Sequence, residues 1–269
     1  MKPGNEPPQP SRDNAGSVES EIRRFDGVLG KPEIDHIVLE EPLEIRVNSE
    51  AFATLMRTPG DDRDLALGFL YAEGVIDSRA DIGALSIHGK DALVSPENSP
   101  QAEPDDSLVN TADLLPADPN REIVIPSRQG PSMSSCGICG KRSISEALAL
   151  TPPTDSQTAS QPWLPPELIG ELPDRLKQRQ ELFIRTGALH AAGIFNQEGK
   201  LLFAREDIGR HNAVDKLVGA ALMEELLPLR KCILQVSGRI SFEIVQKAYR
   251  AGIPALSAVS GASSLSISL

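Results

Sequence analysis

Two cysteines three positions apart carry the most recognisable chemistry in this sequence. Cys136 and Cys139 form a C-x-x-C motif within the segment SSCGICGKR. Glycines beside the two cysteines leave the backbone permissive and the sulfur atoms accessible. The adjacent Lys141 and Arg142 favour the thiolate over the thiol. A thiolate in such a flexible loop is suited to attack sulfur and to carry it as a persulfide, so both cysteines are candidate catalytic residues.

Other interpretations of the cysteine pair are open but less favoured. A structural zinc site needs four ligands, and the only further thiol, Cys232, lies in an apolar segment typical of a buried residue. A thioredoxin-like redox pair normally lies where a strand enters a helix, whereas a proline-bounded loop precedes Cys136. Zinc nucleobase deaminases carry H-x-E before P-C-x-x-C. Here His190-Ala191-Ala192 follows the cysteines, so we exclude deamination and expect no metal.

Two polar segments near the C-terminus are candidate ligand sites. The segment AREDIGRHNAVDK follows a predicted strand and contains Arg205, Asp207, Arg210, His211 and Asn212. Taken alone, it is more typical of a solvated, capped helix start than of a ligand site. Ser237, Gly238 and Arg239 join the end of a second predicted strand to a helix. Backbone N–H groups at a helix N-terminus favour anions, so this turn is a candidate phosphate subsite.

Composition limits the classes of function. The chain has 269 residues, with 27 Lys and Arg against 38 Asp and Glu, a formal net charge of −11. That balance argues against nucleic-acid binding through phosphate neutralisation. No run approaches the ~18 apolar residues of a membrane span, and the N-terminus has no apolar stretch that could serve as a secretory signal. We therefore expect a cytoplasmic protein without a disulfide framework.

The first part of the chain is expected to be a small α+β region. Residues 1–20 are predicted as a disordered tail and 21–130 as the N-terminal region, with β structure over 34–48. A turn at 58–61 leads into a helix over DLALGFLYAEGVI that ends near Gly74. The acidic, proline-rich segment 91–120 is predicted as a surface insertion, and 121–128 as a strand. The flexible C-x-x-C loop and a helix occupy 131–150, and 151–166 is a linker.

Residues 167–269 are predicted as an α/β core. The segment 167–183 is predicted as helical with an interruption at Pro173. ALHAAGIF and KLLFARE flank an NQEG turn, which predicts a β-hairpin. An amphipathic helix is expected over 212–227. A strand over 232–236, a helix capped by Ser241 that ends at Gly252, and a strand over 253–259 form a βαβ unit with a parallel strand pair. The fold class is thus α/β, a mixed sheet with helices beside the smaller N-terminal region.

Taken together, these segments resemble the formate dehydrogenase accessory sulfurtransferase family (FdhD/NarQ). The matching pieces run in the family's order from about Glu41 to Leu265: EEPLEIRVN, TPGDDRDLALGFLYAEGVI, SSCGICGK, TGALHAAGIF, REDIGRHNAVDKLVGAAL, SGRISFEIVQKAYRAGIPAL and AVSGASSL. The resemblance implies a core similar to that of cytidine deaminases and a homodimer. It implies that sulfur is taken as a persulfide from a cysteine desulfurase. The sulfur then passes to a molybdenum bis(molybdopterin guanine dinucleotide) cofactor, which activates formate dehydrogenase.

The resemblance also assigns residue roles. Cys136 matches the persulfide-carrying cysteine and Cys139 the second of the pair. The REDIGRHNA and SGR segments, and so Arg205 to Asn212 and Ser237 to Arg239, are implied to line the pocket for the guanine nucleotide moiety. Members continue after the SSL segment with a further strand and tail, so the core is expected to be shortened here. Two alternative functions remain: a non-catalytic chaperone of the cofactor, and a thiol-disulfide oxidoreductase.

Overall fold

The computed structural model describes residues 16–89, 110–121, 123 and 165–268. Cys136 and Cys139, the predicted helix after them, nearly all of the predicted strand over 121–128 and most of the linker over 151–166 lie outside these residues. No helix in the described ranges is long and apolar enough to cross a membrane. The fold is α/β, as predicted, and is built on two four-stranded sheets.

The first sheet comes from the N-terminal half and has the order β4-β3-β6-β5. Its strands are β3 (Glu41–Val47), β4 (Glu50–Arg57), β5 (Ile82–His88) and β6 (Asn110–Pro116). β3 pairs antiparallel with β4 and parallel with β6, and β5 pairs antiparallel with β6. Together with β2 (Glu33–Val38), β3 confirms the β structure predicted over 34–48.

The second sheet comes from the C-terminal half and has the order β10-β9-β7-β8. Its strands are β7 (His190–Phe195), β8 (Leu201–Asp207), β9 (Ile233–Val236) and β10 (Ala255–Ala258). The predicted hairpin is the antiparallel pair β7–β8. Strands β9 and β10, which precede and follow α6 (Phe242–Arg250) in the sequence, pair with each other in parallel. The mixed sheet and the βαβ unit are therefore confirmed, while the likeness of this core to cytidine deaminases stays a prediction.

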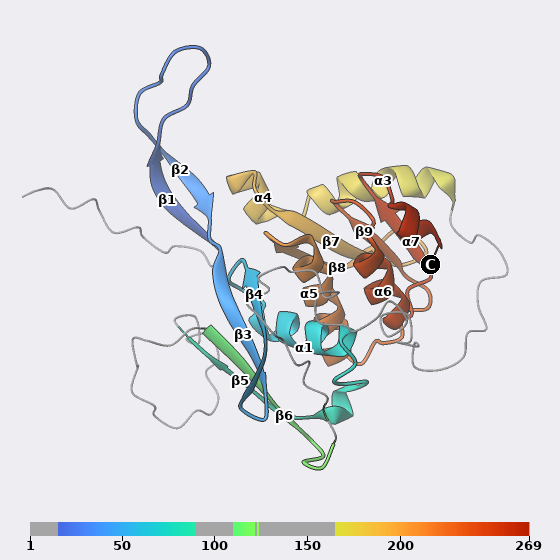
Figure 1. Cartoon of the computed structure of the whole chain (residues 1–269). Coiled ribbons are helices and arrows are strands. Elements are labelled where there is room, and N and C mark those ends of the chain that lie inside the picture. The colour runs from blue at the N-terminus through green and yellow to red at the C-terminus, as the bar shows by residue number, and fades with distance from the viewer. Residues whose placement is uncertain (1–15, 90–109, 122, 124–164, 269) are drawn as a thin grey trace, which may run out of the picture.

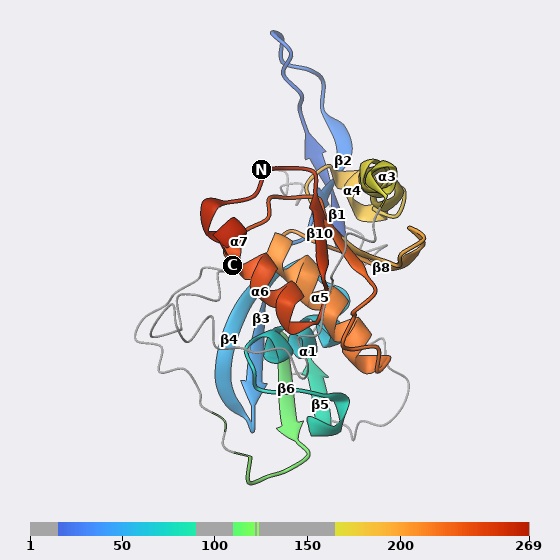
Figure 2. The ribbon, with the colours of Figure 1, turned by 90° about the vertical axis from the view of Figure 1, so that its right-hand side faces the viewer.

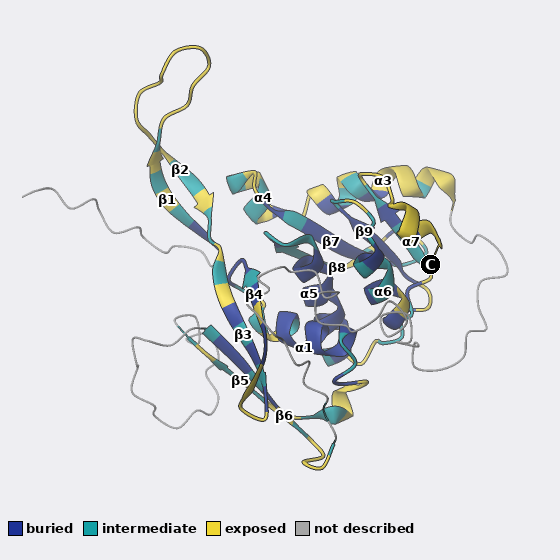
Figure 3. Cartoon of the chain, viewed as in Figure 1, coloured by how far each residue is buried: buried dark blue, intermediate teal, exposed yellow. Residues whose placement is uncertain are grey.

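Two helices lie between the sheets and join the halves of the molecule. Figures 1 and 2 show α1 (Asp62–Ala72) and α5 (Arg210–Met223) side by side between the two sheets. One hydrophobic core contains residues of both sheets and of both helices, and Figure 3 shows the two helices buried along most of their length. The predicted helix stop is confirmed, since Gly74 adopts a left-handed φ of 80° just after α1.

Helix α5 differs from the predicted amphipathic helix over 212–227. Every residue from His211 to Leu222 is buried, because α1 covers one side of the helix and the second sheet covers another. The polar residues on this helix are buried in ion pairs: Lys216 lies 2.9 Å from Asp207, and Asp215 lies 2.6 Å from Lys247. The prediction of a solvated face was wrong because the apolar spacing does not show that the polar positions also have partners.

The packing of α1 on α5 depends on two glycines. A Cβ atom added at Gly68 would lie 1.8 Å from the Asp215 carbonyl oxygen, and one at Gly219 would lie 1.9 Å from the Asp64 carbonyl oxygen. Real Cβ atoms do not approach backbone atoms so closely, so only glycine permits this separation of the two helix backbones. The two contacts are symmetric. Gly68 of α1 packs on Asp215, which lies one helical turn before Gly219 in α5, and Gly219 packs on Asp64, which lies one turn before Gly68 in α1.

The remaining helices differ in one respect from prediction. Helix α3 (Pro166–Lys177) packs Leu172 and Leu176 on the outer face of the second sheet, and α4 (Glu181–Thr186) follows it. The interruption predicted at Pro173 was wrong, because α3 continues through that residue. A proline removes only one i→i−4 bond, and the two buried leucines hold the helix on either side. The helix begins at the end of the predicted linker.

Two domain boundaries also need correction. Strand β1 (Ser17–Ile22) begins inside the predicted tail and pairs antiparallel with β2. Strand β6 occupies the end of the predicted insertion over 91–120 and is an inner strand of the first sheet. Both segments are rich in polar residues, so their strand structure depends on pairing partners distant in the sequence. A 3-10 helix (Arg79–Asp81) and α7 (Ser264–Ser268) complete the described elements.

Candidate functional site

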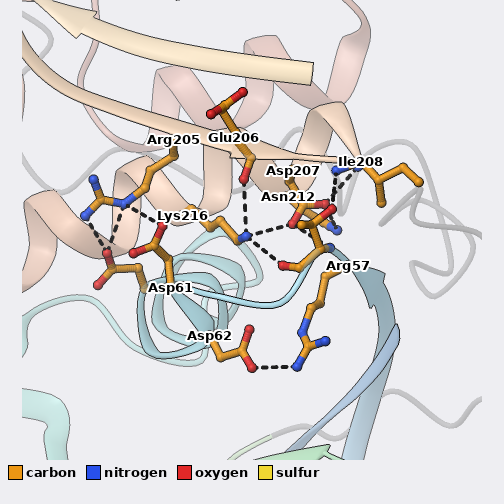
Figure 4. Close-up of polar contacts among 12 residues, drawn as sticks. Arg57, Asp61, Asp62, Arg205, Glu206, Asp207, Ile208, Asn212 and Lys216 are labelled. Carbon is orange, nitrogen blue, oxygen red and sulfur yellow. Dashed lines mark hydrogen bonds and ion pairs between the residues drawn. The ribbon is translucent and has the colours of Figure 1, made fainter. Parts of the chain in front are cut away.

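Asp207, at the end of β8, is a buried anchor for the loop that leads into α1. Its carboxylate accepts hydrogen bonds from the backbone N–H groups of Thr58 (3.2 Å) and Gly209 (2.8 Å) and from the Asn212 side chain (2.9 Å). Lys216 Nζ lies 2.9 Å from the same carboxylate and donates to the Thr58 carbonyl oxygen at 3.0 Å. Figure 4 shows these contacts converging between β8 and the loop. Asp207 and Asn212 therefore hold the two halves of the molecule together.

Arg205 lies two residues before Asp207 on β8 and contacts the start of α1 instead. It forms ion pairs with Asp64 at 2.7 Å and with Asp61 at 3.5 Å. In Figure 4 its guanidinium points away from Asp207 and toward the start of α1. The structure thus separates Arg205 from the other predicted ligand-binding residues of the same segment.

A polar cluster gathers where α5 and α6 begin; we refer to it as the helix-start cluster. It consists of His190, Arg210, His211, Ser237, Gly238, Ser241 and Glu243. Strand β7 runs antiparallel to β8 and β9. The first residue of β7 therefore lies at the same end of the sheet as the carboxyl ends of β8 and β9. A Cβ atom added at Gly238 would lie 3.5 Å from Arg210 Cδ and 3.6 Å from His190 Cε1. Three chain segments therefore meet at this point.

Hydrogen bonds fix most of the helix-start cluster. Ser237 Oγ accepts from the Ala191 backbone N–H at 2.9 Å and lies 3.4 Å from His190 Nδ1. His211 Nε2 lies 3.1 Å from Ser241 Oγ. Ser241 holds the predicted N-cap position of α6, but its hydroxyl makes no capping hydrogen bond to that helix. By contrast, the buried Arg210 Nε has no hydrogen-bond partner among the described residues.

The electrostatics of the helix-start cluster favour an anion. Two helix N-termini point toward it, and each presents unpaired backbone N–H groups and a partial positive charge. Arg210 adds a full positive charge. Burial, reinforced by the neighbouring Arg210 and His211, lowers the pKa of His190 and favours its neutral imidazole. Arg239 is exposed to solvent and extends the positive charge outward.

Glu243 is the one carboxylate of the helix-start cluster. Its Oε2 lies 3.6 Å from His211 Nε2. The His211 imidazole, assisted by hydrogen bonds from the Glu243 backbone N–H and from Ser241, lowers the pKa of the Glu243 carboxyl from 4.5 to about 2. The ionised carboxylate is thus stabilised in the folded state. Its contribution to stability is complete above pH 4.5 and is lost as the pH falls toward 2.

Replacing Glu243 by glutamine should therefore change the acid stability of the protein. We expect the free energy of unfolding of the variant to fall below that of the wild type at pH 6. The difference should shrink as the pH falls from 4.5 toward 2, and urea titrations across this range measure it. Glu224→Gln, at an exposed glutamate just after α5, is the matched control. A difference that does not change with pH would contradict the stabilisation of the ionised Glu243 carboxylate.

The third cysteine lies away from the helix-start cluster. Cys232 is buried in the core, as predicted, and burial raises the pKa of its thiol. In the described ranges, no three His, Cys, Asp or Glu side chains converge on a common metal position.

Sequence analysis missed His190 and Glu243 as members of the helix-start cluster. Only strand pairing brings His190 there, and only the contact between α5 and α6 brings Glu243 to His211.

Comparisons with known proteins agree with this architecture. The model of the FdhD/NarQ family matches residues 38–269. A sulfur carrier protein FdhD of Streptomyces avermitilis is 46% identical over 253 residues, which cover 92% of this chain and 84% of the relative. The corresponding protein of Saccharolobus solfataricus is 38% identical over 256 residues, with coverages of 92% and 88%.

A solved structure has the same fold. It is the crystal structure of a protein from Desulfotalea psychrophila described as a formate dehydrogenase accessory protein. It matches with a TM-score of 0.65 and 21% identity, and covers 94% of this chain and 87% of that one. At this identity the match supports the fold alone. The family model and the sequence relatives carry the assignment: the chain belongs to the FdhD/NarQ family.

Proposed function

We propose that this protein is a sulfur carrier that activates formate dehydrogenase. The observation that carries the proposal is the match over residues 38–269 to a family whose similar members are named sulfur carrier proteins. That range contains Cys136 and Cys139 in a C-x-x-C motif. In this proposal a cysteine desulfurase of the cytoplasm supplies the sulfur, and the molybdenum cofactor of formate dehydrogenase is the acceptor substrate.

The loading step is a thiol–persulfide exchange. The Cys136 thiolate attacks the terminal sulfur of the persulfide on the desulfurase cysteine. The S–S bond of the desulfurase breaks, its cysteine leaves as a thiolate, and a new S–S bond forms on Cys136. One neutral sulfur atom moves, and no external oxidant or reductant is consumed. Lys141 and Arg142 favour the attacking thiolate.

The delivery step requires two electrons, because sulfur leaves the persulfide as sulfide. Cys139 can supply them. Its thiolate attacks the inner sulfur of the Cys136 persulfide, sulfide is released to the acceptor, and a Cys136–Cys139 disulfide remains. A cellular dithiol reductant then restores both thiols. This scheme gives the second cysteine of the motif a defined chemical role.

The helix-start cluster is the proposed site for the guanine nucleotide part of the cofactor. Backbone N–H groups at the two helix N-termini can bind phosphate oxygens. The Arg210 Nε, which has no hydrogen-bond partner in the part of the chain that the structure describes, provides a further donor. Ser237 and Gly238 follow β9, where ligands of α/β folds commonly bind. Asp207 and Asn212 do not belong to this site, but their hydrogen bonds fix the start of α5, which carries Arg210 and His211.

Arg210→Ala should weaken binding of guanosine diphosphate to the purified protein. The loss of a charge-assisted contact predicts a dissociation constant at least about tenfold higher, which isothermal titration calorimetry measures. Arg79→Ala is the control. Arg79 donates to the carbonyl oxygen of Met223 at the opposite end of α5, so its removal should leave the affinity unchanged. Equal affinities of the wild type and the Arg210 variant would argue against this pocket.

The proposed function as a whole is tested by complementation. Cells that lack their own FdhD protein are supplied with this chain, and formate-dependent dye reduction is measured in extracts. We expect formate dehydrogenase activity to appear. A chain that accumulates in soluble form and gives no activity, with a Desulfotalea or Streptomyces relative active in the same cells, would contradict the proposal.

A further inference from the structure

A buried ion pair lies behind the helix-start cluster, about one turn into α5 and α6. Lys247 Nζ donates to both carboxylate oxygens of Asp215, at 2.6 and 2.9 Å, and the two side chains are only 9% and 2% exposed. The ammonium group also lies 5.7 Å from the centroid of the Phe69 ring of α1. The pair therefore connects three helices that meet in the core.

Stability alone does not account for this ion pair. Moving two charges from water into a protein interior carries a large desolvation penalty, and replacing such a pair by apolar side chains is often neutral or stabilising. Apolar side chains would suit the surroundings here, since Phe69, Ile244 and Ala248 are buried in the same core. What the ion pair adds is direction: an ammonium group held between two carboxylate oxygens fixes one register of the helices, whereas apolar contacts are non-directional.

The ion pair is the second of two polar contacts between α5 and α6, which lie side by side in Figures 1 and 2. His211 and Asp215 are four residues apart on α5, and Glu243 and Lys247 are four residues apart on α6, so each couple lies on one face of its helix. In the first contact, His211 Nε2 lies 3.1 Å from Ser241 Oγ and 3.6 Å from Glu243 Oε2. One contact fixes the distance between two helices at a point, and a second contact one turn further along also fixes their rotation.

We propose that Asp215 and Lys247 are positioning residues for the helix-start cluster. Their ion pair sets the N-terminus of α6 against that of α5 and so holds His211 beside Ser241 and Glu243. Both residues are buried behind the cluster, so they act through the helices that carry them rather than on a ligand. The inference rests on the proposed function, in which the cluster is the nucleotide site.

The alignment of the two helices matters because the proposed phosphate donors come from both of them. Arg210 is the first residue of α5, and the unpaired backbone N–H groups of α6 follow Ser241. A relative shift of the helices would move these donors apart, although each helix would remain intact. Loss of the ion pair should therefore reduce the affinity for an anion without unfolding the protein.

The Asp215→Leu/Lys247→Met double variant tests the proposal in the full chain. It removes both charges together, so neither remains buried without a partner, and the new side chains are similar in size. Urea unfolding should show a midpoint at or above that of the wild type. The dissociation constant for guanosine diphosphate, measured by isothermal titration calorimetry, should rise at least about tenfold.

A second measurement on the same variant needs no nucleotide. The pKa of the Glu243 carboxyl, followed by carbon-13 NMR between about pH 3 and pH 6, should rise from about 2 toward 4.5, because His211 is no longer held beside it. The two charges that the variant removes have opposite signs, so their direct effects on this carboxyl oppose each other. The shift therefore reports the position of His211.

Tyr71→Phe is the matched control. It removes the hydrogen bond from the Tyr71 hydroxyl to the Arg250 carbonyl oxygen (2.9 Å), a buried polar contact at the opposite end of α6. The urea midpoint should fall, because the carbonyl oxygen loses this partner. The affinity for guanosine diphosphate and the pKa of Glu243 should stay as in the wild type, which separates lost stability from lost positioning.

Three results for the double variant would overturn the proposal: an unchanged pKa of Glu243, an unchanged affinity where the wild type binds the nucleotide, or a urea midpoint well below that of the wild type. The last result would make the ion pair a stabilising element of the fold. A wild type that does not bind guanosine diphosphate would instead reject the nucleotide site. The pKa of Glu243 would still decide whether Asp215 and Lys247 position His211.

Discussion

Cys136→Ala should abolish the activation of formate dehydrogenase by this protein. Alanine cannot accept a sulfur atom, so no persulfide forms and no sulfur reaches the acceptor. The loss of an essential nucleophile predicts a fall in formate-dependent dye reduction of at least about a hundredfold in complemented cells. Immunoblots of the soluble fraction show whether the variant accumulates like the wild type.

The other two cysteines make the result interpretable. Cys139→Ala should still take up sulfur but should not release it, because the electrons for release come from the Cys139 thiolate. Cys232→Ala is the matched control, since that thiol is buried in the core and has no part in the scheme. Full activation by the Cys136→Ala/Cys139→Ala double variant would instead identify the protein as a cofactor chaperone without sulfur chemistry.

Gly219→Ala is expected to have the largest effect on stability. Its new methyl group would lie 1.9 Å from the Asp64 carbonyl oxygen and 2.7 Å from the Asp64 carbonyl carbon. Backbone atoms cannot move aside as a flexible side chain can, so α1 and α5 must separate. Separation opens the core shared by the two sheets, and overpacking of this severity predicts a loss of about 3 kcal/mol or more. Urea unfolding followed by circular dichroism measures it.

Gly170→Ala, at another helical glycine, is expected to raise the stability of the protein rather than lower it. Gly170 lies inside α3, is exposed, and a Cβ atom there meets nothing within 4 Å. Alanine should therefore stabilise the protein by about 0.5–1 kcal/mol through helix propensity. If Gly219→Ala costs no more than an average surface substitution, the close contact between α1 and α5 is not essential to the fold.

Local sequence patterns predicted the C-terminal sheet well. The β7–β8 hairpin has a polar turn between two apolar runs, and the β9-α6-β10 unit has apolar strands around a helix that ends before Gly252, whose φ is 71°. Each pattern lies within a short stretch of sequence. Strand β6 could not be found in this way, because its segment is acidic and its partners, β3 and β5, supply the hydrogen bonds.

The polar site shows the same limit. Arg210 and His211 stand at a recognisable helix start, and Ser237 and Gly238 follow a recognisable strand, so these were predicted. The segment that contains Arg210 also contains Arg205, and the two guanidinium groups serve different surfaces because they come from a strand and from the helix after it. Spacing in the sequence does not reveal that difference, whereas the ion pair of Arg205 with Asp64 does.

The most direct test of the central claim is the intact mass of the protein after incubation with a cysteine desulfurase and L-cysteine. The wild type should gain the mass of about one sulfur atom, ~32 Da, which a thiol reductant removes. Cys136→Ala should gain none, and Cys139→Ala should keep its sulfur longer than the wild type. A wild type that gains no sulfur while the desulfurase is active, or an equal gain in the Cys136→Ala variant, would contradict sulfur transfer through Cys136.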